Sequence, residues 1–174
     1  MNNYTPLHVH SDSSLLDGLS RTKDIAKRII EIGSFGCAIS DHGTVSGAIS
    51  FLKEMDKAKK KPVLGIELYI CEQHASIQTT ENRKAVHLVI LARNTAGWKQ
   101  ILKIVSESNK PEHLYYKPRL SLEQLSEFLD GNIIGFSGHL GSNVSDSIEK
   151  YGEASGEKTA LYLQEIFGKG NFFL

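Results

Sequence analysis

Imidazole and carboxylate side chains interrupt several apolar segments of this 174-residue chain. His8 and His10 lie on either side of Val9, a spacing that points both side chains to the same face of a strand. Glu67 stands inside the apolar run 63–70, where an unpaired carboxylate would cost several kcal/mol. We therefore expect Glu67 to have a partner or a metal ion. The other residues of this kind in or near predicted strands are Asp17, His42, His87 and His139.

Imidazole and carboxylate groups without thiolate predict a site for zinc, manganese or iron, with more than one ion where carboxylates bridge. Such sites bind phosphate through the metal ions and lower the pKa of a bound water, which makes a nucleophile near neutral pH. Each residue alone has a simpler interpretation. A single histidine in a strand is more often a hydrogen-bonded core residue, and Asp41-His42-Gly43 could form a turn with a helix cap. Their joint occurrence on successive strands favours a metal site.

Basic residues give a weaker signal. Lys117 and Arg119 flank Pro118 in a small basic loop that could contact a phosphate. The sequence shows no interleaving of aromatic and basic residues of the kind that stacks single-stranded nucleic acid. Lys and Arg together number 20, as do Asp and Glu, so the net charge of zero argues against an overall electrostatic attraction to nucleic acid.

The composition is that of an ordinary globular protein, with 40% hydrophobic and 23% charged residues, which excludes a disordered chain. The longest apolar stretches are too short to span a bilayer, and the N-terminus shows no signal peptide, so we expect no membrane partner. Cys37 and Cys71 are far apart, which makes a disulfide framework improbable and a reducing cytoplasm the expected location.

Apolar runs alternate with helical patterns. The predicted strands are Tyr4–Val9, Gly36–Ser40, Pro62–Ile70, Val86–Ala92, Asn132–Ser137 and Phe172–Leu174. Helices are expected to begin at Ser20 or Thr22, at Thr44, at Thr95, at a Ser121/Gln124 capping box and near Glu157. This alternation predicts an α/β fold built from parallel βαβ units, either a barrel or an open sheet. His87 falls at the start of its apolar run, whereas barrel sites gather at strand ends.

The same residues resemble a known family. The run 7–11 (Leu-His-Val-His-Ser), the run 14–18 (Ser-Leu-Leu-Asp-Gly) and Ser40-Asp41-His42-Gly43 are similar to the opening of the bacterial DNA polymerase III alpha subunit. That opening is its PHP (polymerase and histidinol phosphatase) domain. Further similar segments follow in the same order: 62–69, 87–94, 117–119 and 137–141.

The resemblance implies a distorted seven-stranded (βα) barrel with parallel strands around a trinuclear centre, so that two to three divalent ions (Zn, Mn or Fe) are expected. Carried over by motif, the metal ligands are His8, His10, Asp17, His42, Glu67, His87 and His139. The family hydrolyses phosphoesters. The resemblance therefore implies a 3′–5′ exonuclease-type site in a DNA-directed DNA polymerase, with metal-bound hydroxide as nucleophile supported by Asp17 and His42. DNA and other replisome subunits are the expected partners.

Two alternatives stay open: a catalytically silent PHP module that stabilises a polymerase, and a free-standing PHP phosphatase of small phosphate monoesters. The sequence also departs from the family pattern at two points. His139 stands where these polymerases commonly have Cys, which shifts the preference toward harder ions. The family's last two ligands come from an Asp-x-His motif, which does not occur in this chain. We therefore interpret 1–174 as the N-terminal portion of the domain, without its last strands and last ligand motif.

Overall fold

The computed structural model describes residues 4–15 and 17–174. The helices are α1 (Thr22–Glu31), α2 (Ala48–Lys57), α3 (Thr95–Ser108), α4 (Leu122–Ser126), α5 (Asn143–Tyr151) and α6 (Glu153–Phe167). The strands are β1 (Gly36–Ile39), β2 (Lys61–Cys71), β3 (Ala85–Ala92), β4 (Leu114–Tyr115), β5 (Lys117–Ser121), β6 (Ile133–Phe136) and β7 (Phe172–Phe173). The expected α/β class is confirmed.

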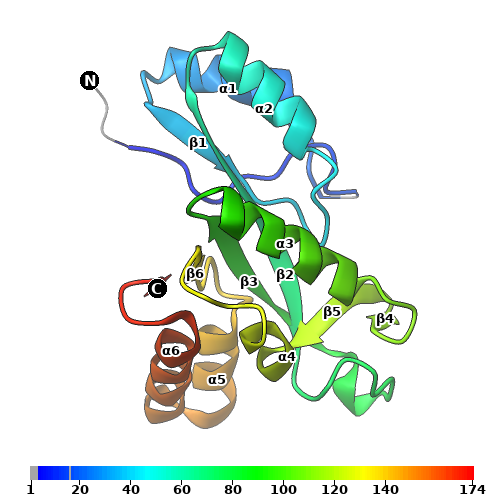
Figure 1. The fold of residues 1–174 in the computed structure, drawn as a ribbon. Coiled ribbons are helices and arrows are strands. Elements are labelled where there is room, and N and C mark those ends of the chain that lie inside the picture. The colour runs from blue at the N-terminus through cyan, green and yellow to red at the C-terminus, as the bar shows by residue number, and fades with distance from the viewer. Residues whose placement is uncertain (1–3, 16) are drawn as a thin grey trace.

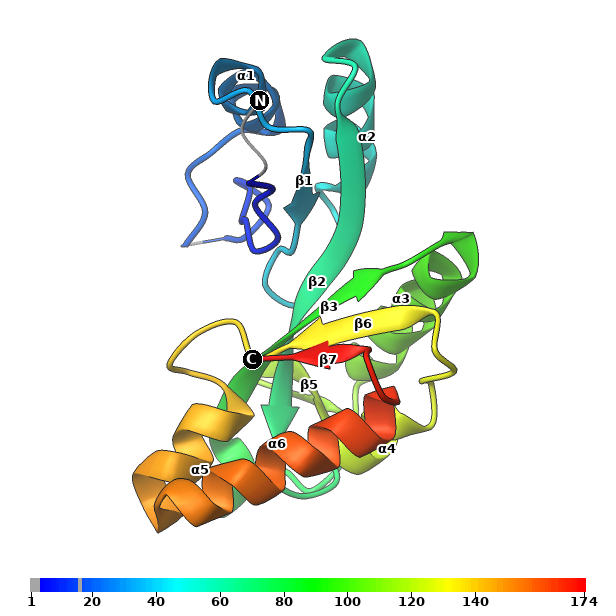
Figure 2. The ribbon, with the colours of Figure 1, turned by 90° about the vertical axis from the view of Figure 1, so that its left-hand side faces the viewer.

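Strand β2 is a long strand that runs through both parts of the molecule and connects them (Figures 1 and 2). Its first half, Lys61–Leu64, pairs with β1 beside helices α1 and α2. Its second half pairs with β3 along Gly65–Cys71 and, at Tyr69–Cys71, with β5. The sheet then runs in the order β4-β5-β2-β3-β6-β7, with β1 attached to β2 beside this path. Both parts therefore meet along one strand.

The expectation of parallel strands holds for three pairs and is wrong for the other three. Pairs β1–β2, β2–β5 and β6–β7 are parallel, whereas β2–β3, β3–β6 and β4–β5 are antiparallel. The β2–β3 connection contains only the short 3-10 helix Glu81–Arg83 in place of a crossover helix, so the chain reverses direction. Within the described residues the sheet stays open, with β4 and β7 at the two ends of its path.

The predicted first strand, Tyr4–Val9, is wrong. This segment runs beside β1 and accepts two backbone hydrogen bonds, from Ala38 N to Pro6 O (2.8 Å) and from Ser40 N to Val9 O (2.9 Å), but forms no ladder. Pro6 has no N–H to donate, which removes one ladder bond at its centre. The positions of His8 and His10 therefore do not depend on strand pleating.

The helix starts were predicted with mixed success. Ser121 and Gln124 form the expected capping box at α4. The hydroxyl of Thr44 pairs with that of Ser46 and does not cap α2, which begins four residues later at Ala48. Helix α6 begins at Glu153, four residues before the position expected near Glu157, and α5 and the hairpin β4–β5 were not predicted. These missed elements are short or polar, so they give little periodic signal.

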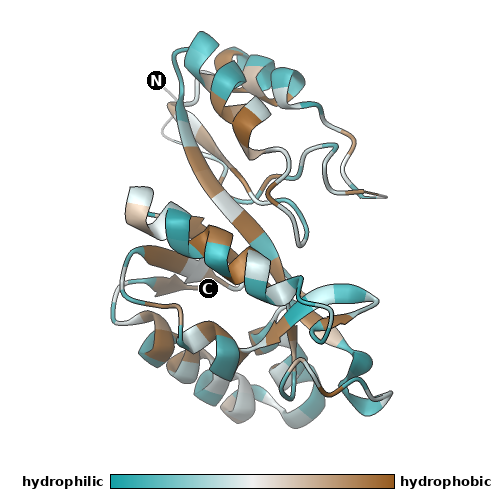
Figure 3. Ribbon diagram, turned by 45° about the vertical axis from the view of Figure 1, so that its right-hand side comes forward, coloured by the Kyte–Doolittle hydropathy of each residue, from teal (hydrophilic) through white to brown (hydrophobic). Residues whose placement is uncertain are grey.

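The larger hydrophobic core lies on one face of the β2–β3 sheet. Ile66, Leu68 and Ile70 point to this face and pack with Ile101 and Ile104 of α3. Because side chains alternate along a strand, Glu67 and Tyr69 point to the opposite face. Figure 3 shows hydrophobic residues concentrated on the strands, with hydrophilic residues on the outer turns of the helices. Burial of the even-numbered residues thus fixes the direction of the Glu67 carboxylate.

A second core joins α1, α2 and β1 through residues such as Ile29, Ile39 and Phe51. It holds the end of β1, where the chain continues into Asp41 and His42, against β2. None of the helices in the described ranges has the length and apolarity needed to cross a membrane.

Candidate metal centre

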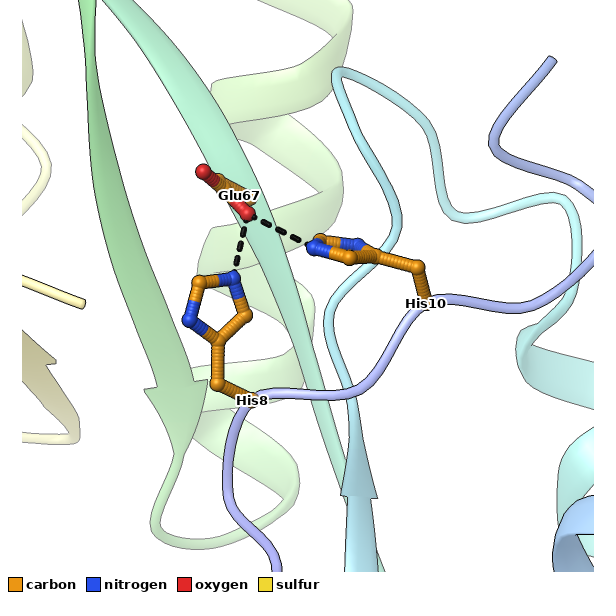
Figure 4. Close-up of side chains that lie close together, drawn as sticks. All are labelled: His8, His10 and Glu67. Atoms are coloured by element: carbon orange, nitrogen blue, oxygen red, sulfur yellow. Dashed lines mark hydrogen bonds and ion pairs between the residues drawn. The ribbon is translucent and has the colours of Figure 1, made fainter. Parts of the chain in front are cut away.

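The Glu67 carboxylate lies at the centre of a group of imidazoles and is fully buried. Its Oε2 atom is 2.5 Å from His8 Nε2 and 3.1 Å from His10 Nε2 (Figure 4). Both histidines come from the irregular segment beside β1, and Figure 4 shows them approaching the carboxylate from two directions. One carboxylate oxygen therefore faces one histidine pair.

The other oxygen, Glu67 Oε1, faces a second pair. It lies 2.6 Å from His87 Nδ1 and 2.9 Å from His139 Nε2. His87 is paired with Tyr69 in the β2–β3 ladder, so it projects from the same face as Glu67. Because β3 is antiparallel to β2, the start of β3 lies beside the second half of β2. This reversal explains why a histidine at the start of its apolar run reaches the site.

His42 and Asp17 form the outer part of the group. His42 Nε2 is 2.5 Å from Asp17 Oδ2, and His42 Nδ1 is 3.7 Å from Glu67 Oε2. Backbone bonds hold His42 beside β2, since Gly43 N donates to Glu67 O (2.9 Å) and Glu67 N donates to Asp41 O (3.1 Å). The Asp17 side chain is 60% exposed, so this carboxylate lies at the mouth of the site.

All seven residues expected as ligands come together in space, although they come from segments spread over residues 8–139. The rings of His10 and His42 stack with centroids 4.3 Å apart, and those of His87 and His139 lie 5.0 Å apart. Two groups have ligand atoms within 4.8 Å of one another: His8, His10 and Glu67, and His42, Glu67 and His87. Glu67 belongs to both groups, so one carboxylate is common to the two sets of ligand atoms.

Burial and hydrogen bonding shift the pKa values of these groups. Burial alone raises the pKa of Glu67, but hydrogen bonds from His10, His8 and His87 outweigh it and hold that pKa far below the ordinary value. The hydrogen bond to Glu67 raises the pKa of His10 against the opposing effect of burial. Burial lowers the pKa of His42, which favours the neutral imidazole that a metal ion requires.

The donor atoms of these residues fit divalent metal ions. His42 Nδ1, which faces Glu67 Oε2 at 3.7 Å, is buried and makes no hydrogen bond within the described part of the chain. A buried ring nitrogen without a partner is costly in a protein interior, and a metal ion can use such a nitrogen as a ligand. Both cysteines are free and buried, and neither belongs to the two groups found among the described residues, so the donors are imidazole and carboxylate only. This donor set suits zinc, manganese or iron.

The two residues expected to contact phosphate lie in different surroundings. Arg119 is 1% exposed, and its guanidinium donates to the carbonyls of Asn82, Ala75 (3.0 Å) and Ile77 (3.1 Å). Its terminal nitrogens are therefore occupied by a loop, and the expectation of a phosphate contact is corrected for this residue. Lys117 is exposed, and its Nζ lies 4.2 Å from the centre of the Tyr69 ring at the edge of the site.

Two residues of the site were missed. Tyr69 follows Glu67 by two positions on β2, and its ring stacks on His42 at 5.8 Å and meets His87 at 5.1 Å. The i, i+2 spacing from Glu67 was the available signal. Asp41 is buried and accepts hydrogen bonds from Ser11 N (2.6 Å), Ser11 Oγ (2.8 Å) and Ser14 Oγ (2.9 Å). Because Asp41 directly precedes His42, these hydrogen bonds hold the loop after His10 against the segment that carries His42.

Comparison with known proteins shows the family of the chain. Residues 6–174 match the PHP domain family. The chain is 35% identical to a DNA polymerase III subunit alpha of Borreliella burgdorferi over 97% of its length, and 34% identical to one of Helicobacter pylori over 98%. It spans 15% of the length of each of these relatives.

Among solved structures, the chain has a weak likeness to a protein described as a metal-dependent phosphoesterase from Bifidobacterium adolescentis. That likeness has a TM-score of 0.41 at 17% identity and covers 93% of this chain and 50% of the other. The family assignment therefore depends on the sequence match together with the imidazole–carboxylate site. On that evidence, the chain belongs to the PHP domain family.

Proposed function

We propose that this chain contributes a metal-dependent phosphoesterase site, of the 3′–5′ exonuclease type, to a DNA polymerase III alpha-type protein. The observation that carries the proposal is the fully buried Glu67 carboxylate, with a histidine pair on each oxygen. A buried carboxylate shared by two groups of ligand atoms is suited to hold two ions close together. The similarity to DNA polymerase III alpha subunits supports a phosphodiester of DNA as the substrate.

In this proposal the ligands of two to three divalent ions (Zn, Mn or Fe) are His8, His10, Asp17, His42, Glu67, His87 and His139. Bound ions of this kind neutralise the charge of a phosphate and lower the pKa of a coordinated water to give a hydroxide nucleophile. Asp17 Oδ2 lies 2.5 Å from His42 Nε2 at the mouth of the site, which positions this pair to orient the attacking water. Lys117 supplies a positive charge at the edge for the phosphate.

The proposal extends to the rest of the protein. Residues 1–174 form the N-terminal portion of a PHP barrel, and polymerisation belongs to other parts of a protein of the relatives' length. DNA and other replisome subunits are the partners, and the cytoplasm is the location. The parallel strands β1, β2 and β5 supply the beginning of such a barrel.

The test is metal content and nuclease activity of the intact protein that carries this sequence. Elemental mass spectrometry should find at least two zinc, manganese or iron ions per chain, and a 5′-labelled oligonucleotide should be shortened from its 3′ end in a metal-dependent way. The double variant His8→Gln/His10→Gln should lose the nuclease activity while polymerisation continues. Absence of metal ions and of hydrolysis in the unmodified protein would contradict the proposal and leave the catalytically silent module.

A further inference from the structure

An exposed tyrosine occupies an unfavourable backbone conformation at the turn of the hairpin β4–β5. Tyr116 is the residue that connects the two strands, with φ at 63°, in the left-handed region that bulky residues rarely adopt. Its side chain is nevertheless 73% exposed. Strained positions of this kind persist only where the surrounding structure imposes them, and they cluster at binding sites.

Several contacts hold the ring of Tyr116 in place. The guanidinium carbon of Arg83 lies 4.3 Å from the centre of this ring, and the ring of Tyr115 meets it at 4.8 Å and 64°. Below Tyr115 lies the buried guanidinium of Arg119, at 4.9 Å from the centre of the Tyr115 ring. Because Arg119 is anchored to three loop carbonyls, it gives Tyr115 a rigid base, and Tyr115 in turn contacts Tyr116. We call Arg83, Tyr115, Tyr116 and Lys117 the tyrosine platform.

Lys117 links the platform to the metal centre. Lys117 directly follows Tyr116, and its Nζ lies over the ring of Tyr69. Tyr69 in turn contacts the rings of His42 and His87. In the described part of the chain, Arg83 and Lys117 both lie against aromatic rings, with their positive charges at an exposed surface. Aromatic and cationic groups therefore lie between the hairpin turn at Tyr116 and the imidazoles, with Lys117 and Tyr69 in contact.

We propose that the tyrosine platform binds single-stranded DNA, with a base stacked on Tyr116 and the adjacent phosphates on Arg83 and Lys117. Aromatic rings stack any base, and neighbouring cations follow the backbone, which is the common means of binding single strands without sequence preference. The direction of the strand, with its scissile phosphodiester at the metal centre, rests on the proposed function. The stacking itself does not require hydrolysis. The expectation that the sequence lacks interleaved aromatic and basic residues overlooked Tyr115, Tyr116 and Lys117, which are consecutive, and only Arg83 joins the platform through folding.

Photo-crosslinking of the intact protein tests this proposal. The probe is a 12-nucleotide single-stranded oligothymidylate with one 5-iododeoxyuridine near its 3′ end and phosphorothioate linkages that resist hydrolysis. Long-wave ultraviolet light joins an iodouracil to an aromatic side chain stacked on it, and mass spectrometry of the digested protein identifies the residue. We expect a cross-link at Tyr116.

Matched variants separate stacking from folding. Tyr116→Gly removes the ring and relieves the positive φ, so this variant should fold and yet lose the cross-link by roughly ten-fold or more. Tyr116→Phe keeps a ring and should keep the cross-link. The control is Tyr151→Ala, because Tyr151 is 71% exposed, nearly the same as Tyr116, but lies on α5. The control should cross-link at Tyr116 as the unmodified protein does.

The outcomes distinguish this inference from the proposed function. Cross-links found only at other residues, or unchanged yield in Tyr116→Gly, would overturn the inference even if the protein hydrolyses DNA. A Tyr116 cross-link in a protein without nuclease activity would keep the platform and reject the phosphoesterase proposal. Unlabelled single-stranded DNA should compete with the probe, and equal competition by duplex DNA, or stronger competition by RNA, would contradict the assignment to single-stranded DNA.

Discussion

Replacing Glu67 by Gln should reduce metal binding more than replacing any one of the surrounding histidines. The reason is geometric, because Glu67 belongs to both groups of ligand atoms whereas His8 and His87 belong to one group each. Its Oε2 lies within 3.1 Å of two imidazole nitrogens and its Oε1 within 2.9 Å of two others. Glutamine has nearly the same shape but carries no charge to bridge two cations.

The size of the effect follows from the number of sites affected. Removing a group that only orients a ligand costs about 10- to 100-fold in metal affinity. Loss of a direct, charged ligand should reach at least the upper end of that range, about 100-fold or about 2.7 kcal/mol for each ion. Glu67→Gln should therefore weaken two ions, whereas His8→Gln and His87→Gln should each weaken one.

The assay is zinc titration of the intact protein against a chromophoric chelator, with metal content after dialysis measured by elemental mass spectrometry. We expect two fewer retained ions in Glu67→Gln and one fewer in each histidine variant. Glu54→Gln is the control, because Glu54 pairs with Lys57 at the surface of α2 at 2.7 Å and should not affect the content. If Glu67→Gln lost no more metal than His87→Gln, the bridging role of Glu67 would be refuted.

Three further predictions concern His10, Asp41 and Arg119. Zinc affinity should fall as the pH is lowered from 8 to 6, because the raised pKa of His10 means that a proton must leave before a metal ion can bind. The same chelator competition at the two pH values measures this change, and a pH-independent affinity would be inconsistent with His10 as a ligand. Asp41→Asn should lower metal affinity about 10- to 100-fold, because it weakens the hydrogen bonds that hold Ser11 and Ser14 beside His42. Asp56→Asn on α2 is the control, and an unchanged affinity in Asp41→Asn would show that Asp41 does not position the site. Arg119→Met should destabilise the loop 72–84 by about 3–5 kcal/mol, since three carbonyls lose a buried charged donor. Limited proteolysis measures the opening of this loop, and a loop that stays fully protected in the variant would contradict the role of Arg119 as its anchor.

The sequence alone determined much of the local structure and the chemistry of the site. The apolar runs identified β1, β2, β3, β6 and β7, and the Ser121/Gln124 pair identified the start of α4. These features depend on neighbouring residues, so periodicity and capping chemistry reveal them. The improbable placement of Glu67 within an apolar strand also showed, without a structure, that a partner was needed.

The tertiary structure decided which groups share a surface. Only the antiparallel β2–β3 pairing brings His87 beside Glu67, and only the loop carbonyls turn Arg119 from an expected phosphate contact into a buried anchor. The same folding places Arg83 on Tyr116 and Lys117 on Tyr69. Strand direction, burial and contact between distant residues are fixed by packing over the whole chain, and no local pattern of residues contains that information.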